Sequence, residues 1–121
     1  AFVEGLSALV EEARAVGFEP LVETHTRDEV EEALQTDARV IGVNSRDLKR
    51  LEVDLSNAEQ LLPHVPEDRI AVAESGMETP EDVRCMVDAG ADAVLVGTAI
   101  TRSDNVREKT RELVEAQGTQ A

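Results

Sequence analysis

Val-Glu-Thr-His-Thr (22–26) and, about twenty residues later, Ile-Gly-Val-Asn-Ser-Arg-Asp-Leu (41–48) are the most informative stretches of the sequence. In each of them an aliphatic run ends in a polar side chain, first a glutamate and then an asparagine. Two more runs have the same form, Ile-Ala-Val-Ala-Glu-Ser-Gly (70–76) and Ala-Val-Leu-Val-Gly-Thr (93–98). Parallel α/β folds collect their functional groups at the carboxyl ends of such strands. The four segments therefore predict one site that is assembled strand by strand.

Helical patterns separate these runs. Apolar spacing and capping residues predict helices over residues 3–16, 27–36, 55–63, 80–89 and 106–116, and strands over 19–24, 39–43, 69–74 and 92–97. Thr26 is expected to cap the second helix in a capping box with Glu29, and Thr79 with Pro80 to begin the fourth. Either Asp54 or Ser56 caps the third. Continuous aliphatic strands are typical of a parallel sheet that is covered on both faces.

This order, α-βα-βα-βα-βα, predicts an α/β fold in which four parallel βα units follow one helix. A length of 121 residues predicts a single domain over 1–121. Four βα units are half of a (βα)8 TIM barrel. The first helix looks like the end of a preceding unit and the chain begins at Ala1, so we expect the C-terminal half of a longer protein, or a deliberately made half. Open edges and an uncovered aliphatic face predict a homodimer that closes an eight-stranded barrel, or association with an N-terminal half-barrel.

The charge of the chain limits its partners. Twenty-six acidic residues against 12 basic ones give a net charge of -14, which predicts a surface that repels nucleic acid and anionic membranes. Such a surface suits a cytoplasm of high salt concentration, although an ordinary acidic cytosolic protein has the same composition. We expect a cytoplasmic location, because no signal peptide or apolar run of about 20 residues is seen. The lone Cys85 agrees with a reducing compartment and is expected to be a buried or half-buried apolar residue.

Glycine turns after the last two runs predict a phosphate site. Ser75-Gly76 and Gly97-Thr98 each follow an aliphatic strand, and loops in these positions of (βα)8 barrels commonly bind phosphate. Glycine allows close approach of the backbone, and free amides at a helix start supply donors. The alternative is that Gly76 and Gly97 only make tight turns.

Other strand-end side chains can carry chemistry. Glu23 is a candidate general acid or base, unless it is an ordinary exposed glutamate. Asn44 can both donate to and accept from a substrate, and Arg46 can bind an anion, unless Asp47 pairs with it. His25 is expected to stabilise the loop or cap the helix rather than act catalytically, and His64 to be structural or solvated. No metal-ligand spacing, Gly-x-Gly-x-x-Gly pattern or P-loop is seen, so no metal or cofactor is predicted.

Five segments together resemble indole-3-glycerol-phosphate synthase over about residues 5–115. They are Leu-Val-Glu-Thr-His-Thr (21–26), Val-Ile-Gly-Val-Asn-Ser-Arg-Asp-Leu (40–48), Val-Asp-Leu-Ser (53–56), Ala-Glu-Ser-Gly-Met (73–77) and Gly-Ala-Asp-Ala-Val-Leu-Val-Gly-Thr-Ala-Ile (90–100). The first two segments are specific to that family, whereas the last also occurs in other phosphate-binding barrels such as thiazole synthase and pyridoxal-phosphate synthase.

This resemblance implies a carboxy-lyase of tryptophan biosynthesis. The reaction converts 1-(2-carboxyphenylamino)-1-deoxyribulose 5-phosphate to indole-3-glycerol phosphate, carbon dioxide and water without a cofactor. The implied catalytic residues are Glu23, which handles protons, and Asn44, which orients the substrate. The implied substrate-binding residues are Arg46, Glu74 and Ser75, and the implied phosphate-binding residues are Gly76, Gly97 and Thr98.

The resemblance also implies groups that this sequence lacks. The family has a carboxylate and a lysine on strand one and a second lysine, the general acid, on strand three. The two lysines here, Lys49 and Lys109, do not follow strands and do not match them. We therefore expect little or no activity from this chain alone, since loss of a general acid costs roughly 10²–10⁴ in rate. A self-associating half-barrel that at most binds phosphate, and another phosphate-binding barrel enzyme, remain the alternatives.

Overall fold

The computed structural model describes residues 2–46 and 54–118. Its strands are β1 (Leu21–Thr24), β2 (Val40–Asn44), β3 (Ile70–Glu74) and β4 (Ala93–Leu95). Its helices are α1 (Phe2–Ala15), α2 (Arg27–Leu34), α3 (Leu55–Leu61), the 3-10 turn η1 (Leu62–His64), α4 (Pro80–Ala89), α5 (Thr98–Thr101) and α6 (Val106–Gly118). The predicted alternation of helices and strands is confirmed.

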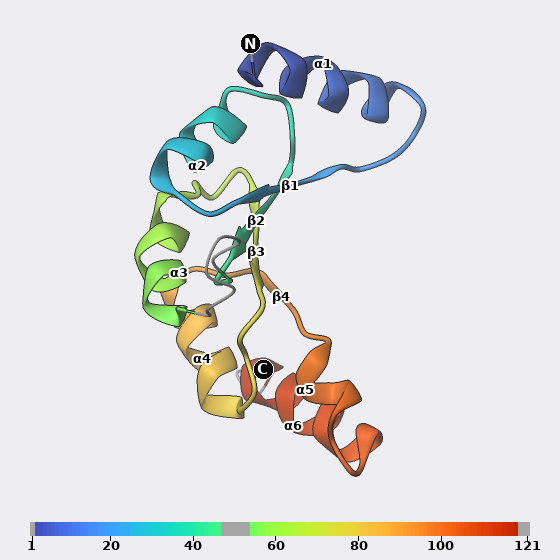
Figure 1. The fold of residues 1–121 in the computed structure, drawn as a ribbon, viewed down its shortest axis with the longest axis vertical. Coiled ribbons are helices and arrows are strands. Elements are labelled where there is room, and N and C mark those ends of the chain that lie inside the picture. Colours follow the sequence, from blue (N-terminus) through green and yellow to red (C-terminus); the bar gives the residue numbers. More distant parts are fainter. Residues whose placement is uncertain (1, 47–53, 119–121) are drawn as a thin grey trace.

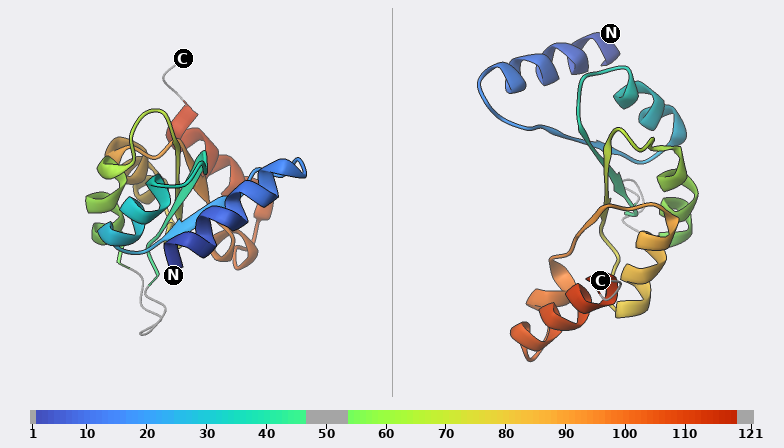
Figure 2. Two further views of the ribbon diagram at one scale, coloured as in Figure 1. Left: turned by 90° about the horizontal axis from the view of Figure 1, so that it is seen from above. Right: turned by 180° about the vertical axis from the view of Figure 1, so that it is seen from behind.

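The strands form one parallel sheet in the order β1-β2-β3-β4. Each strand pairs with the next one in the chain. This order agrees with successive right-handed βα connections whose helices lie on the same face of the sheet. Figure 1 shows α2, α3 and α4 side by side on one side of the strands, with α1 at one end and α5 and α6 at the other. The view from behind shows the same curved layer of strands, with the side away from α2, α3 and α4 open between α1 at one end and α5 and α6 at the other (Figure 2). The architecture is half of a (βα)8 barrel, as predicted.

Alternate residues of each strand face the helices and form the core. Ile41 and Val43 on β2 and Ala71 and Ala73 on β3 are almost fully buried. They belong to two hydrophobic clusters: the larger one joins β2 and β3 to α3, α4 and α6, and the smaller one joins α1, α2, β1 and β2. The aliphatic side chains on the helical side of the strands are therefore buried against the helices, away from water.

The other alternate residues face the concave side, which we call the inner face. Its apolar members Leu21, Ile70 and Leu95 are 43%, 46% and 56% exposed. Among the described residues, β1 and β4 each pair with one neighbouring strand, so the sheet has two open edges. The prediction of an uncovered apolar face is confirmed for this part of the chain.

The helix caps follow the sequence closely. Thr79 and Asp82 form a full capping box on α4. Asp54, rather than Ser56, caps α3, and its carboxylate accepts from the Ser56 amide at 3.0 Å. Thr26 caps α2 and accepts from the Glu29 amide at 3.1 Å, but the Glu29 carboxylate accepts from the amide of His25 instead of closing the box on Thr26.

Three further predictions differ from the structure. The last strand ends at Leu95 rather than 97, because the chain turns there into the short helix α5, which the sequence pattern did not indicate. The end of the third helix is a 3-10 turn at Pro63. Cys85 is exposed on α4 rather than buried or half-buried, because Val83 and Met86 form the side of this helix that faces the core.

Candidate functional site

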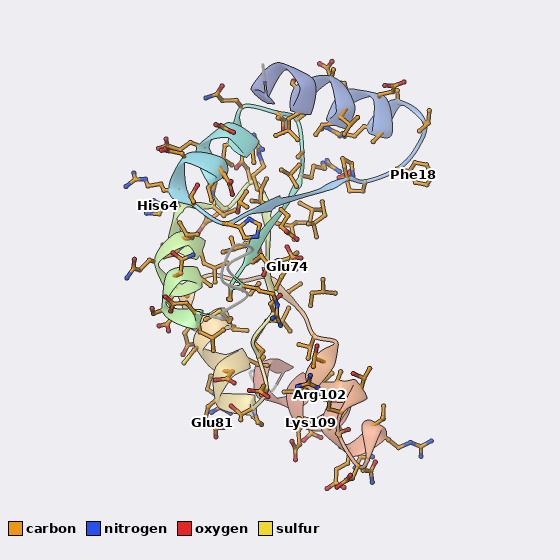
Figure 3. The ribbon with its side chains drawn as sticks, viewed as in Figure 1. Phe18, His64, Glu74, Glu81, Arg102 and Lys109 are labelled. Atoms are coloured by element: carbon orange, nitrogen blue, oxygen red, sulfur yellow. The ribbon has the colours of Figure 1, made fainter. Side chains whose placement is uncertain are left out.

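Three predicted site residues lie on the inner face. Glu23 pairs in register with Gly42, and Asn44, two residues further along β2, pairs with Glu74. Because side chains alternate along a strand, Glu23, Asn44 and Glu74 project from the same side of the sheet. Figure 3 labels Glu74 in the middle of the molecule, beside the strands and far from the exposed Phe18 and His64. The sheet register therefore brings two carboxylates and one amide side chain together.

Glu23 and Glu74 form an interacting pair of carboxyl groups. Glu74 is 6% exposed, and its Oε2 atom has no hydrogen-bond partner among the described residues. Burial, and then the negative charge and the carboxyl of Glu23, raise the pKa of Glu74 to about 7, whereas His25 opposes this rise. A carboxyl group with a pKa near 7 can donate or accept a proton at neutral pH. The site thus contains a group suited to acid-base chemistry.

Gly42 provides the space for the Glu74 side chain. It lies on β2 between Glu23 and the neighbouring strand β3. A Cβ atom on this glycine would overlap Glu74 Oε2 and would lie 2.8 Å from Leu21 Cδ2. Any larger residue would therefore move the Glu74 carboxylate. This role was not recognised from the sequence, where Gly42 is one apolar residue within a strand.

The two glycine turns line one cavity of about 450 Å³. Ser75 and Gly76 have positive φ angles of 69° and 79°, which direct the chain sharply away from β3. Such a conformation is unfavourable for serine, and strained backbone of this kind is often found at functional sites. Gly97 and Thr98 form the opposite part of the lining, at the start of α5. The predicted convergence of residues 75–76 and 97–98 is therefore found.

The amides at the start of α5 are available to this cavity. The first amide of this turn to donate within the helix is that of Ile100, which bonds to the Gly97 carbonyl at 3.0 Å. The amides of Thr98 and Ala99 precede it and are therefore outside the hydrogen-bonded part of the helix. A Cβ atom on Gly97 would have no heavy atom within 4 Å, so the glycine does not relieve an internal clash. It instead keeps the wall of the cavity free of a side chain.

Two arginines also line the cavity. Arg46 was predicted; its amide donates to Asn44 Oδ1 at 2.8 Å, so the loop after β2 holds the Asn44 side chain. Arg102, which immediately follows α5, was missed, because α5 was not expected and nothing in the sequence placed this residue beside β3. The suggested ion pair of Arg46 with Asp47 lies outside the described residues.

Glu23 faces a second cavity, of about 410 Å³, between α1 and β1. Leu6, Leu9 and Val10 form its apolar wall, and His25 and Glu29 lie at its polar end. Glu23 and Asn44 do not line the first cavity, whereas Glu74 does. Glu23 lines one cavity and Glu74 the other, so the interaction between these two carboxyl groups links the two cavities.

Residues 2–46 and 54–118 lack two other kinds of site. No group of three or more His, Cys, Asp or Glu side chains could hold a metal ion. No helix has the length and apolar character to cross a membrane.

Comparison with known proteins decides the family. Residues 3–113 match the family model of indole-3-glycerol phosphate synthase. The chain belongs to this family. It is 50% identical over 116 residues to the indole-3-glycerol phosphate synthase of Haloarcula marismortui, covering 93% of the chain and 43% of that protein. The Kineococcus radiotolerans synthase is 47% identical over 113 residues (93% and 41%), and the Methanocaldococcus jannaschii synthase 43% over 111 residues (92% and 41%). The chain thus spans less than half the length of these relatives.

Solved structures support the fold independently. A thiamine phosphate pyrophosphorylase from Pyrococcus furiosus superimposes with a TM-score of 0.71 at 22% identity, covering 88% of this chain and 53% of that one. A structure described as native KDPGal gives 0.66 at 21% identity, with 91% and 53% covered. At these identities the likeness concerns the fold alone. In each case about half of the other chain is matched, in agreement with a half-barrel.

Proposed function

We propose that this chain provides the phosphate-binding half of an indole-3-glycerol-phosphate synthase site, corresponding to strands five to eight of the barrel. The reaction joins the aromatic ring of 1-(2-carboxyphenylamino)-1-deoxyribulose 5-phosphate to its ketone carbon, and releases carbon dioxide and water. The observation that carries the proposal is the convergence of Glu23, Asn44 and Glu74 on the inner face, next to the cavity of the two glycine turns.

The carboxyl pair would handle protons. Loss of water requires an acid that protonates the leaving hydroxyl group and a base that removes a proton from the ring system. Glu23, the more exposed carboxylate, would take part in these transfers, while Glu74, with a pKa raised to about 7, would face the aromatic end of the substrate. The Asn44 amide NH₂ would orient the substrate by donating to it, since Asn44 Oδ1 accepts from the Arg46 amide.

The cavity would hold the phosphate group. Backbone amides of Gly76, Gly97 and Thr98 would supply neutral donors, with Ser75 beside them. Arg46 and Arg102 would provide positive charge in a chain whose net charge is -14. Local donors of this kind allow an acidic protein to bind an anion.

The chain would need the remaining half of the barrel for turnover. Of its two lysines, Lys109 lies in α6 and Lys49 lies outside the described residues, so neither is placed at the end of a described strand. The partner would be an N-terminal half-barrel that covers Leu21, Ile70 and Leu95 and pairs with the open strand edges. We propose a cytoplasmic location, as expected for this biosynthetic step.

Reconstitution tests the proposal. The purified chain would be mixed with a separately produced segment containing the first four βα units of the Haloarcula marismortui synthase, and formation of indole-3-glycerol phosphate measured. We expect turnover from the mixture at least about 100-fold above that of the chain alone. A mixture with Glu23→Gln should lose this gain, and a matched Glu19→Gln mixture should keep it. Near-normal turnover by the chain alone, or none in a stably associated mixture, would contradict the proposal.

A second candidate is a self-associating half-barrel module that binds phosphate without catalysing the reaction. The exposed apolar residues of the inner face favour it, because a second copy could cover them about a twofold axis. Analytical ultracentrifugation in concentrated salt separates the two cases. A stable homodimer that does not exchange with the N-terminal segment would favour the module.

A further inference from the structure

His25 lies between two carboxylates at the end of β1. Its Nε2 atom is 3.5 Å from Glu23 Oε1, and its Nδ1 atom is 3.4 Å from Glu29 Oε1. The side chain is 21% exposed, and Nε2 is buried without a hydrogen bond to the described residues. Both ring nitrogens therefore point to acidic groups, and one of these groups is the carboxylate proposed to handle protons.

The backbone of His25 is anchored independently of the ring. Its amide donates to Glu29 Oε1 at 2.6 Å, and its carbonyl accepts from Asn57 Nδ2 of α3 at 3.2 Å. At α4 the equivalent acid, Asp82, accepts from the amide of Glu78, the residue that precedes the cap there. The capping arrangement thus works at α4 with a glutamate in the position of His25. Capping alone gives no reason for an imidazole between Glu23 and Glu29.

Acidic groups surround the ring from several elements. Glu23 comes from β1, Glu29 and Glu32 from α2, and Glu74 from β3; the first three line the same cavity as His25. Glu74 responds to both Glu23 and His25: the charge of Glu23 raises its pKa and that of His25 lowers it. A group that can carry positive charge here reduces the repulsion between carboxylates that lie close together.

We infer that His25 is a positioning residue, which holds the Glu23 carboxylate beside Glu74 and is itself oriented by Glu29. The inference rests on the proposed function, because the contact matters for catalysis only if Glu23 transfers protons. Glu29 has two tasks: its carboxylate fixes the His25 backbone and also faces ring Nδ1, so the end of β1 and the ring are positioned together. An acid that orients a histidine beside a reacting group is a recurring arrangement in enzymes.

The first test measures the titration of Glu74 in the full 121-residue chain. The chain would be labelled with ¹³C-glutamate, and the carboxyl resonance that is missing in Glu74→Gln would be followed with pH. We expect His25→Gln to raise the midpoint above the wild-type value of about 7 by up to one pH unit, because the charge interaction by which His25 lowers the Glu74 pKa is lost. The exposed His64, changed to Gln, is the matched control and should leave the midpoint unchanged.

A second variant keeps the test valid if His25→Gln does not fold. Glu29→Gln retains an oxygen that can accept from the His25 amide but removes the charge that faces ring Nδ1. We expect a smaller upward shift of the Glu74 midpoint in this variant. If neither variant moves the midpoint, His25 serves only the loop, and the inference is overturned.

The second test uses the enzyme reconstituted with the N-terminal segment. We expect His25→Gln to lower kcat by about tenfold or more while KM changes by less than about threefold, since the residue acts through Glu23. Equal kcat values for variant and wild type would overturn the inference. If the wild-type mixture is itself inactive, the proposed function fails, but the titration of Glu74 still decides whether His25 positions the carboxylate pair.

Discussion

The two faces of the sheet come from the same strands but differ in how far their apolar side chains are buried. Towards the helices, Ile41, Val43 and Ala73 are fully buried by the chain itself. Towards the inner face, Leu21, Ile70 and Leu95 are about half exposed, and polar residues lie among them. The helical face therefore stabilises the fold, whereas the inner face carries the candidate site and leaves apolar side chains exposed.

The largest expected effect contrasts two isoleucines on opposite faces. Ile41→Ala should lower the free energy of unfolding by about 2–5 kcal/mol, because it leaves a cavity in the fully buried core. Ile70→Ala should cost less than about 1 kcal/mol in dilute protein, because that side chain is 46% exposed. Urea unfolding at two protein concentrations measures both. Equal losses in the free energy of unfolding in dilute protein would contradict the difference between the two faces. A loss for Ile70→Ala that depends on protein concentration would show that another copy covers the inner face.

The next effect concerns the buried carboxyl group. The pKa of Glu74 is raised from 4.5 to about 7, so the folded state binds more protons than the unfolded state between these pH values. The free energy of unfolding should therefore fall as pH rises from about 4.5 to 7, by at most about 3 kcal/mol. Glu74→Gln should remove this fall and stabilise the chain at pH 8, with little effect at pH 4.

Unfolding by urea between pH 4 and pH 8 checks this prediction. Glu81→Gln on the exposed surface of α4 is the control and should change the pH profile little. A wild-type profile that rises from pH 5 to pH 7, or a Glu74→Gln variant that is less stable than wild type at pH 8, would show that this carboxyl is held as an anion in the folded state.

A smaller effect tests the charge of the outer surface. With a net charge of -14, the folded chain repels itself more strongly than an expanded one, and salt screens this repulsion. Raising potassium chloride from 0.1 M to 2 M should increase the free energy of unfolding by about 1 kcal/mol. Thermal unfolding at several salt concentrations measures it. No increase would argue against the predicted adaptation to high salt.

The smallest effect on stability is expected at Gly42. A Cβ atom there meets the ends of the Glu74 and Leu21 side chains, which can move, so Gly42→Ala should cost less than about 1 kcal/mol. It should nevertheless displace the Glu74 carboxylate and change its titration midpoint. Gly5, for which a Cβ atom meets nothing within 4 Å, gives the control Gly5→Ala. An unchanged Glu74 midpoint in Gly42→Ala would show that this glycine does not position the carboxylate.

Much of the fold could be predicted from local patterns. Aliphatic runs gave the four strands, and Thr26 and Thr79 marked the starts of α2 and α4 because a capping side chain bonds to amides only three residues away. The short helix α5 could not be predicted in this way. It has four residues, no side-chain cap and no apolar repeat. Its formation depends on how the chain turns after β4.

The sequence predicted several residues of the candidate site but not how they interact. The strand-end rule correctly grouped Glu23, Asn44 and Glu74, because parallel strands bring their carboxyl ends to one edge. It gave no information on Arg102, on the space that Gly42 provides or on the position of the His25 ring. The contacts of Arg102 and Gly42 involve different βα units and depend on register and curvature, whereas those of the His25 ring lie within β1 and α2 but depend on how the chain turns between them.

The strand-forming segments, the helix caps and the polar groups at the strand ends follow from local sequence, since these properties depend on neighbours along the chain. The burial of Glu74 against Glu23, the rise of its pKa to about 7 and the cavity that includes both glycine turns follow from the folded arrangement. Desolvation and charge interactions depend on distances in space, and the pairing of β1, β2 and β3 fixes those distances.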